Sequence, residues 1–217
     1  MERQAGYEQH RSEQRDFILD AAAALFVERG IDAVSFSTVA ASCKMTRSTL
    51  YRYFQDKQTL LWAISQRLLG RIGDGMKRRA GNGSAFQRFR AYLEEFYQSF
   101  EENPDFLRFF GEFEDVYQEE TARRGGEGYQ KAFKPGDFGS GDTVRFLTEK
   151  FSDGSIRAGL DPTETAVAVT YAGIHAVVGL SKDRDVLALK YGVEAKRLVR
   201  LTFDMILHGL QSEIASA

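Results

Sequence analysis

The chain has 217 residues, of which 43% are hydrophobic and 28% are charged, and its formal net charge is -2. This length suits one large domain or a small domain joined to a larger one, with enough apolar residues for a buried core. Because the total charge is nearly neutral, any DNA-binding surface has to be a local basic patch. One cysteine, Cys43, excludes a disulfide within the chain. The polar N-terminus and the lack of a run of about 18 apolar residues predict a cytoplasmic protein with no membrane partner.

Apolar residues recur with helical spacing along most of the chain, and no strand alternation is visible, so we predict an all-α protein. Three helices are expected first, over residues 12–29, 36–42 and 46–54. Ser35 and Thr46 are suitable N-caps for the second and third helices, and Gly30 is a suitable C-cap for the first. A fourth helix is expected from Asp56 to the glycine-rich stretch at residues 71–75.

The rest of the chain predicts a second helical region. Basic residues followed by Gly, Asn and Ser predict a linker or turn over residues 77–84. Further helices are expected over residues 84–102, from Pro104 to a glycine-rich loop at 123–141, and over 142–157, 162–181 and 193–214. We therefore divide the chain into an N-terminal domain at residues 1–57, a connecting helix at 56–72 and a larger helical domain at 73–217.

Three short helices with a tight turn between the second and third match the helix-turn-helix plan. Such a unit places the start of its last helix in the DNA major groove, and here that start carries Thr46, Arg47, Ser48 and Thr49. Arg47 can donate two hydrogen bonds to guanine, and the hydroxyl groups of Ser48 and Thr49 can reach base edges or phosphates. Donors for the phosphate backbone follow in Tyr51, Arg52, Tyr53 and Lys57.

Charge is concentrated at the same place. Residues 44–57 hold four basic side chains against Asp56 alone, a net of +3 in a chain whose total is -2. This pattern is typical of a DNA-reading helix. On spacing and charge alone, a solvated surface helix with a chance cluster of basic residues is the alternative.

The N-terminal sequence over residues 17–64 resembles the TetR family. The segments that carry the resemblance are AAAALFVERG, FSTVAASCKMTRSTLYRYF and DKQTLL. The resemblance implies a DNA-binding domain followed by a helical sensor domain of divergent sequence. It also implies DNA contacts for Ser37 and for the residues named above, with Lys57 contacting a phosphate and with Leu50 and Phe54 packing in the core.

Three residues depart from the family pattern. Lys44 stands where the family usually has a turn glycine, and a positive φ at a non-glycine residue costs stability. Ser48 replaces a frequent glycine or alanine, and Gln58 replaces a frequent glutamate. These departures leave open which contacts read bases.

Residues 94–120 hold ten acidic side chains and one basic one, so this region should point away from DNA. Helical spacing favours a solvated acidic face over an acidic pocket for a cationic ligand. Aromatic residues at helical spacing are usually core, yet a sensor pocket is also largely apolar. Candidates for a ligand pocket are therefore Phe96, Phe100, Phe109, Phe110, Phe113, Tyr117, Phe146, Tyr171 and His175.

The helix expected over residues 162–181 is apolar nearly all round, so it must be covered on both sides. Together with the last helix it can form a four-helix interface between two subunits, and the family resemblance implies the same pairing. The expected interface residues are Ala172, Ala176, Gly179, Leu198, Leu201 and Met205. Burial of this helix entirely within its own domain is the alternative.

No catalytic, metal or cofactor site is expected. His10, His175 and His208 lie far apart in the sequence, and no metal-ligand spacing, phosphate-binding loop or nucleophile elbow occurs. The sequence thus predicts a homodimeric repressor, not an enzyme, that is released from a palindromic operator in double-stranded DNA by a small apolar or aromatic effector. The alternatives are an activator or co-ligand-requiring regulator of the same fold, a helical enzyme, and a protein-interaction module.

Overall fold

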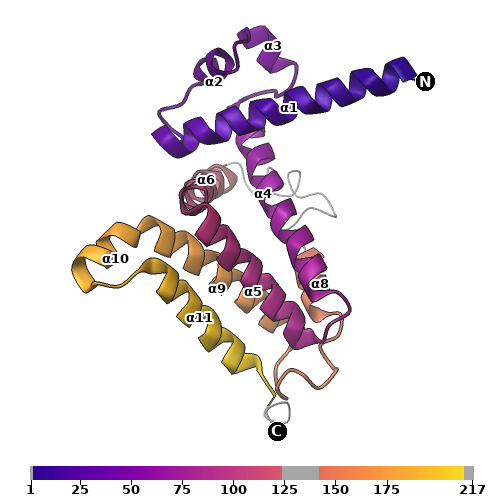
Figure 1. Cartoon of the computed structure of the whole chain (residues 1–217), viewed down its shortest axis with the longest axis vertical. Coiled ribbons are helices and arrows are strands. Elements are labelled where there is room, and N and C mark those ends of the chain that lie inside the picture. The colour runs from indigo at the N-terminus through magenta and orange to yellow at the C-terminus, as the bar shows by residue number, and fades with distance from the viewer. Residues whose placement is uncertain (1, 124–141, 213–217) are drawn as a thin grey trace.

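The computed structural model describes the backbone of residues 2–123 and 142–212, and the side chains of residues 6–113 and 143–212. Over these residues the protein is all-α, as predicted. In chain order the helices are α1 (Glu2–Arg29), α2 (Phe36–Ser42), α3 (Arg47–Tyr51), α4 (Lys57–Ala80), α5 (Ala85–Glu102), α6 (Pro104–Arg123), α8 (Asp142–Thr148), α9 (Pro162–Lys182), α10 (Arg184–Tyr191) and α11 (Ala195–Leu210). Figure 1 shows a small head of α1, α2 and α3 above a body of later helices, with α4 joining the two.

Capping side chains fix where the short helices of the head begin. The Ser35 hydroxyl accepts a hydrogen bond from the backbone N–H of Thr38 at 3.0 Å, and the Thr46 hydroxyl accepts one from Thr49 at 3.1 Å. Such caps satisfy backbone donors that a helix start leaves free. Both caps are the ones the sequence predicts. The core that the three helices share includes Ile18, Phe26, Val34, Val39, Leu50 and Phe54.

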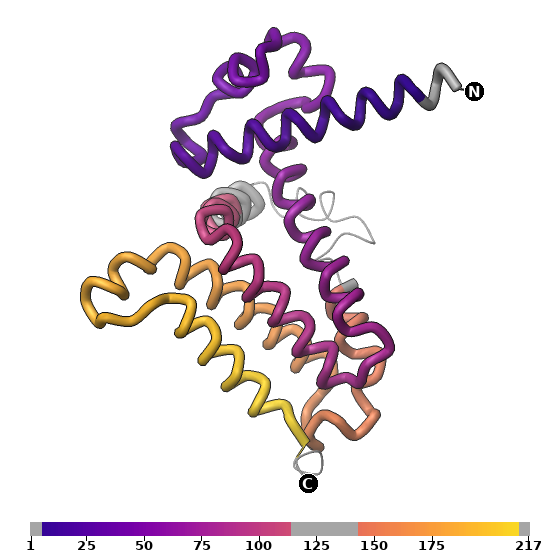
Figure 2. The backbone as a smooth tube through the Cα atoms, viewed as in Figure 1, coloured from indigo at the N-terminus to yellow at the C-terminus, as the bar shows by residue number. Residues whose placement is uncertain are grey.

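One continuous helix, α4, leads from the head into the body (Figure 2). The predictions that it ends near residues 71–75 and that a linker covers 77–84 are wrong, because α4 runs to Ala80 and only a short turn separates it from α5. The helix packs along α5, where Ile72 and Met76 are 2% and 1% exposed. Burying these side chains offsets the cost of about 1 kcal/mol for each glycine inside the helix.

Aromatic side chains fill the core of the body. α5 contributes Phe89, Tyr92, Phe96 and Phe100, and α6 contributes Phe106, Phe109, Phe110 and Phe113, all buried. α9 packs against α5, α6, α8 and α11, so it is the central helix of the body. The phenol of Tyr92 donates to the backbone carbonyl of Thr170 at 3.2 Å, which satisfies its one polar atom inside this core.

Other helix boundaries also differ from the prediction. α1 begins at Glu2 and not near residue 12, α8 ends at Thr148 and not near residue 157, and α10 was not predicted. Beyond α8 the chain turns through Gly154 and Gly159, whose φ angles are 82° and 86°. Only glycine adopts this conformation readily, so these two residues favour turns over a longer helix.

The head contacts the body through α6 as well as through α4. The rings of Phe26 in α1 and Phe109 in α6 stack with their centres 5.8 Å apart. Beside them, Arg108 donates a hydrogen bond to the backbone carbonyl of Val27 at 3.4 Å. On α4, Arg67 forms an ion pair with Asp20 of α1. Two helices of the body therefore hold the head in place.

Candidate functional site

The start of α3 is exposed on one side, and its other side packs on the core of the head. Leu50 is fully buried and Phe54 is 1% exposed, so the opposite side of the helix faces outward. The predicted DNA-contacting residues Ser37, Thr46, Arg47, Ser48, Tyr51 and Arg52 are exposed, and Thr49 and Tyr53 are half-buried. The structure thus brings the residues of α3 and its flanks together on one outer surface of the head, at the top of Figure 1.

Arg47 forms no ion pair with the side chains that the structure describes. Its guanidinium donates to the hydroxyl of Tyr51 at 3.4 Å and lies over the same ring, 5.9 Å from its centre. The ring of Tyr51 packs in turn on Phe36, with the centres 4.9 Å apart. A chain of contacts from the core of the head therefore positions Arg47 without neutralising it.

Lys57 is placed differently from the other predicted DNA contacts. Its ammonium donates to the backbone carbonyl of Ile31 at 2.5 Å and lies 5.8 Å from the centre of the Phe26 ring. Burial lowers the pKa of this ammonium, and the nearby carboxylate of Asp32 partly opposes that effect. The side chain thus holds the end of α1 against the start of α4, with two ammonium donors left for a phosphate.

The predicted aromatic pocket residues lie in different surroundings among the described side chains. Five of them are packed in the core of the body: Phe96, Phe100, Phe109, Phe110 and Phe113. Phe146 is half-buried, with Arg88 over its ring at 4.5 Å. Tyr171 and His175 stack on each other on the exposed side of α9, and the side chain of Tyr117 lies outside the described ones. Core and pocket positions follow the same helical period, so a ligand-contacting role for these residues stays a prediction.

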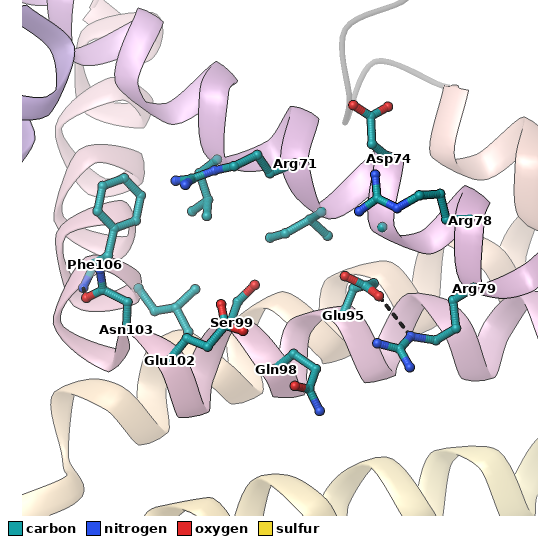
Figure 3. Close-up of a pocket in the computed structure, with 14 residues that line it drawn as sticks. Arg71, Asp74, Arg78, Arg79, Glu95, Gln98, Ser99, Glu102, Asn103 and Phe106 are labelled. Carbon is teal, nitrogen blue, oxygen red and sulfur yellow. Dashed lines mark hydrogen bonds and ion pairs between the residues drawn. The ribbon is translucent and has the colours of Figure 1, made fainter. Parts of the chain in front are cut away.

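A cavity of about 860 Å³ does occur in the body, between α4, α5 and the start of α6 (Figure 3). None of the eight predicted pocket residues whose side chains the structure describes lines it. Its walls are largely polar and include Arg71, Arg78 and Arg79 from α4 and Glu95 from α5. Sequence reasoning missed these residues because it ended the fourth helix near Gly73. The available signal was the spacing of Arg71 and Arg78, which are seven residues apart and share a helix face.

The predicted subunit interface lies on an uncovered side of the body. Leu201 and Met205 of α11 are 56% and 67% exposed, and Ala172 of α9 is also exposed. The remaining predicted residues, Ala176, Gly179 and Leu198, are half-buried. Although α9 is strongly apolar, none of the helices within the described residues is long and apolar enough to cross a membrane.

Comparisons with known proteins identify a family motif in the N-terminal part of the chain. Residues 18–64 match the model of the bacterial regulatory proteins of the tetR family. The HTH-type transcriptional activator FasR of Mycolicibacterium smegmatis is 28% identical over 113 residues, which are 52% of each chain. The match therefore spans about half the length of that relative.

Solved structures share the fold over nearly the whole chain. A putative TetR-family transcriptional regulator from Rhodococcus sp. has a TM-score of 0.64 at 24% identity, over 90% of this chain and 99% of that one. AibR, in complex with isovaleryl coenzyme A and operator DNA, has a TM-score of 0.54 at 21% identity, over 88% of this chain and 97% of that one. Residues 18–64 thus carry the N-terminal motif of the TetR family, and the whole fold is similar to that of regulators in this family.

Proposed function

We propose that the protein is a transcriptional regulator that binds double-stranded DNA through α3. The observation that carries this proposal is the outward side of α3, where Arg47 and Arg52 are exposed above a buried Leu50. Guanidinium groups read guanine in the major groove and bind phosphates, and hydroxyl groups such as that of Ser48 can do either. The operator DNA in the AibR complex, a protein of the same fold, supports the same role here. A regulator of this kind would act in the cytoplasm.

The DNA-binding form is a homodimer on this proposal. The uncovered sides of α9 and α11 supply an apolar surface that a second subunit can bury. Two heads related by a two-fold axis would read a palindromic operator, with their recognition helices about 34–36 Å apart in successive major grooves. The domain division proposed here keeps residues 1–57 as the reading unit and the helices after α4 as the dimerising unit.

A small effector would control DNA binding through α4. This helix leaves the head directly behind α3 and forms one wall of the cavity in the body. A ligand shifts DNA affinity only if it binds one arrangement of the heads better than another. We propose that effector binding releases the protein, acting as a repressor, from its operator. Activation of transcription is the second candidate, because FasR is named an activator.

Selection of bound sequences from a random pool of duplex DNA tests this function. The wild-type protein should enrich a palindrome, and Arg47→Ala should weaken binding to it by about 1–3 kcal/mol if Arg47 reads a guanine. Arg90→Ala is a matched control, because Arg90 is an exposed arginine of α5, in the body. Equal losses for the two variants would exclude base reading by Arg47, and no enrichment at moderate salt would contradict the proposed function.

A further inference from the structure

The cavity between α4 and α5 is large enough for a small organic molecule. Its volume of about 860 Å³ falls within the range of roughly 300–1,000 Å³ that ligand sites usually have. The first turn of α6 closes one end, on the side toward the head (Figure 3). A molecule bound there would touch both helices that hold the head, α4 and α6.

The end of the cavity nearest the head has an apolar floor. Leu68 and Ile72 from α4 and Phe106 and Leu107 from α6 line it, and all four are no more than 8% exposed. These side chains are packed from behind, so the apolar part of a ligand can rest on them without rearranging the core. This end therefore suits a hydrocarbon group.

Some of the charged side chains around the cavity are already in ion pairs, and others are not. Glu95 is already paired with Arg79 at 2.8 Å, and its carboxylate lies against α4 at Gly75, where a Cβ atom would clash with it. In contrast, Arg71 and Arg78 form no ion pair within the described side chains. Two guanidinium groups are thus available.

Fewer acidic than basic side chains are unpaired and face the cavity. In Figure 3 the carboxylate of Asp74 points away from α5, so it does not face the cavity. That leaves Glu102 at the exposed rim as the free carboxylate opposite Arg71 and Arg78. An anion can therefore bind an arginine here without displacing a protein carboxylate, whereas a cation would meet two like charges.

Further donors lie across from Arg71. Asn103 uses its side-chain oxygen to accept from the backbone N–H of Phe106 at 3.2 Å, which leaves its NH₂ group free to donate. The hydroxyl of Ser99 lines the same wall. Arginine, amide and hydroxyl donors thus surround the edge of the apolar floor.

We propose that this cavity binds an amphipathic organic anion, with its acidic group held by Arg71 and Asn103 and its hydrocarbon part on Leu68, Ile72, Phe106 and Leu107. Arg78 adds favourable charge from the far end. Binding itself is independent of DNA, whereas the role of such a molecule as the effector rests on the regulatory function proposed above.

A matched series of eight-carbon probes tests the charge preference. Octanoate, octanamide and octylamine share one chain and differ in the charge of the head group, and their binding to the full-length protein can be measured by isothermal titration calorimetry. Octanoate should bind at least tenfold more tightly than the other two. Equal affinities, tighter binding of the amine, or no heat from octanoate at millimolar concentration would each overturn the proposal.

Arg71→Gln locates the anion. This change should weaken octanoate binding at least tenfold and leave octanamide binding unaltered. Lys77→Gln is the matched control, because Lys77 is an exposed cation of α4 that does not line the cavity, and it should leave octanoate binding unchanged. The same loss in both variants, or none in Arg71→Gln, would overturn the assignment. Octanoate binding that depends on Arg71 while DNA affinity stays constant would refute only the effector role.

Discussion

Lys44 has a left-handed backbone at the turn between α2 and α3, with φ of 54°. Its N–H bonds the carbonyl of Ala41 and the N–H of Met45 bonds that of Ala40, both at 3.0 Å, which closes the end of α2. A helix C-cap with these two hydrogen bonds normally has glycine at the residue with the left-handed backbone. The strain expected from the sequence is therefore present, and the turn tolerates it because both hydrogen bonds are made.

Replacing Lys44 with glycine should stabilise the protein by about 1 kcal/mol, because glycine adopts this backbone conformation without a Cβ clash. Chemical denaturation would measure the change in the free energy of unfolding. Lys44→Ala is the control, since it removes the same charge but keeps the strain. If the alanine variant gained as much stability as the glycine variant, backbone strain would not be the cause.

Between elements, α5 and α11 are joined by an ion pair supported by an aromatic ring. Arg200 donates to both carboxylate oxygens of Glu94, at 2.7 and 3.2 Å, and its guanidinium lies 3.6 Å from the centre of the Tyr97 ring. The hydrogen bond from Arg200 is the main reason why the pKa of Glu94 falls below its ordinary value of 4.5, although partial burial opposes the shift. A bidentate ion pair of this kind restricts the angle between the helices as well as their distance.

The contribution of this pair should depend on pH. Because the pKa of Glu94 is lower in the folded protein, its stabilisation is complete well above pH 4.5 and is lost as the pH falls through the folded value. Glu94→Gln should cost about 1–2 kcal/mol at pH 7, and the difference between wild type and variant should shrink toward pH 3. Urea denaturation at several pH values measures it, and a constant difference would refute this account.

Helix starts that carry a capping side chain were predictable from local signals, whereas the starts of α1 and α10 and the ends of α4 and α8 were not. Ser35, Thr46, Asp56, Ser84 and Asp161 each accept a backbone hydrogen bond at the helix start that the sequence suggests. The end of α4 depends instead on packing against α5, which no local pattern reports. The sequence predicts a longer helix at α8, although Gly154 and Gly159, which follow it, favour turns.

At the scale of the molecule, apolar exposure is confined mainly to one part of the body. Seven of the ten large exposed hydrophobic side chains among the described residues lie on α9, α10 and α11, and Leu189 of α10 is 90% exposed. The proposed DNA-contacting residues could be brought together from the sequence alone because they are adjacent in it. The cavity could not, because its walls come from helix faces that only the packing of α4 on α5 brings together.

Met205→Glu should turn the proposed dimer into a monomer of 24.5 kDa, because it places a charge in the middle of an apolar surface. Sedimentation velocity would measure the mass, and circular dichroism would check that the exposed substitution leaves the fold intact. The control is Tyr7→Glu, since Tyr7 is 61% exposed but lies on α1. A variant that remains dimeric would place the interface elsewhere.

Because α4 is one continuous helix, a tilt in the part that lines the cavity would move the head. Gly70, Gly73 and Gly75 lie in the middle of the helix, and the arm from Lys57 to Leu69 has 13 residues, or roughly 20 Å. A tilt of about 15° at the glycines would move each head by roughly 5 Å. In a two-fold dimer the two displacements add to about 10 Å, a large fraction of the 34–36 Å between successive major grooves. A modest adjustment around a bound molecule would therefore be enough to put the two reading helices out of phase with the DNA.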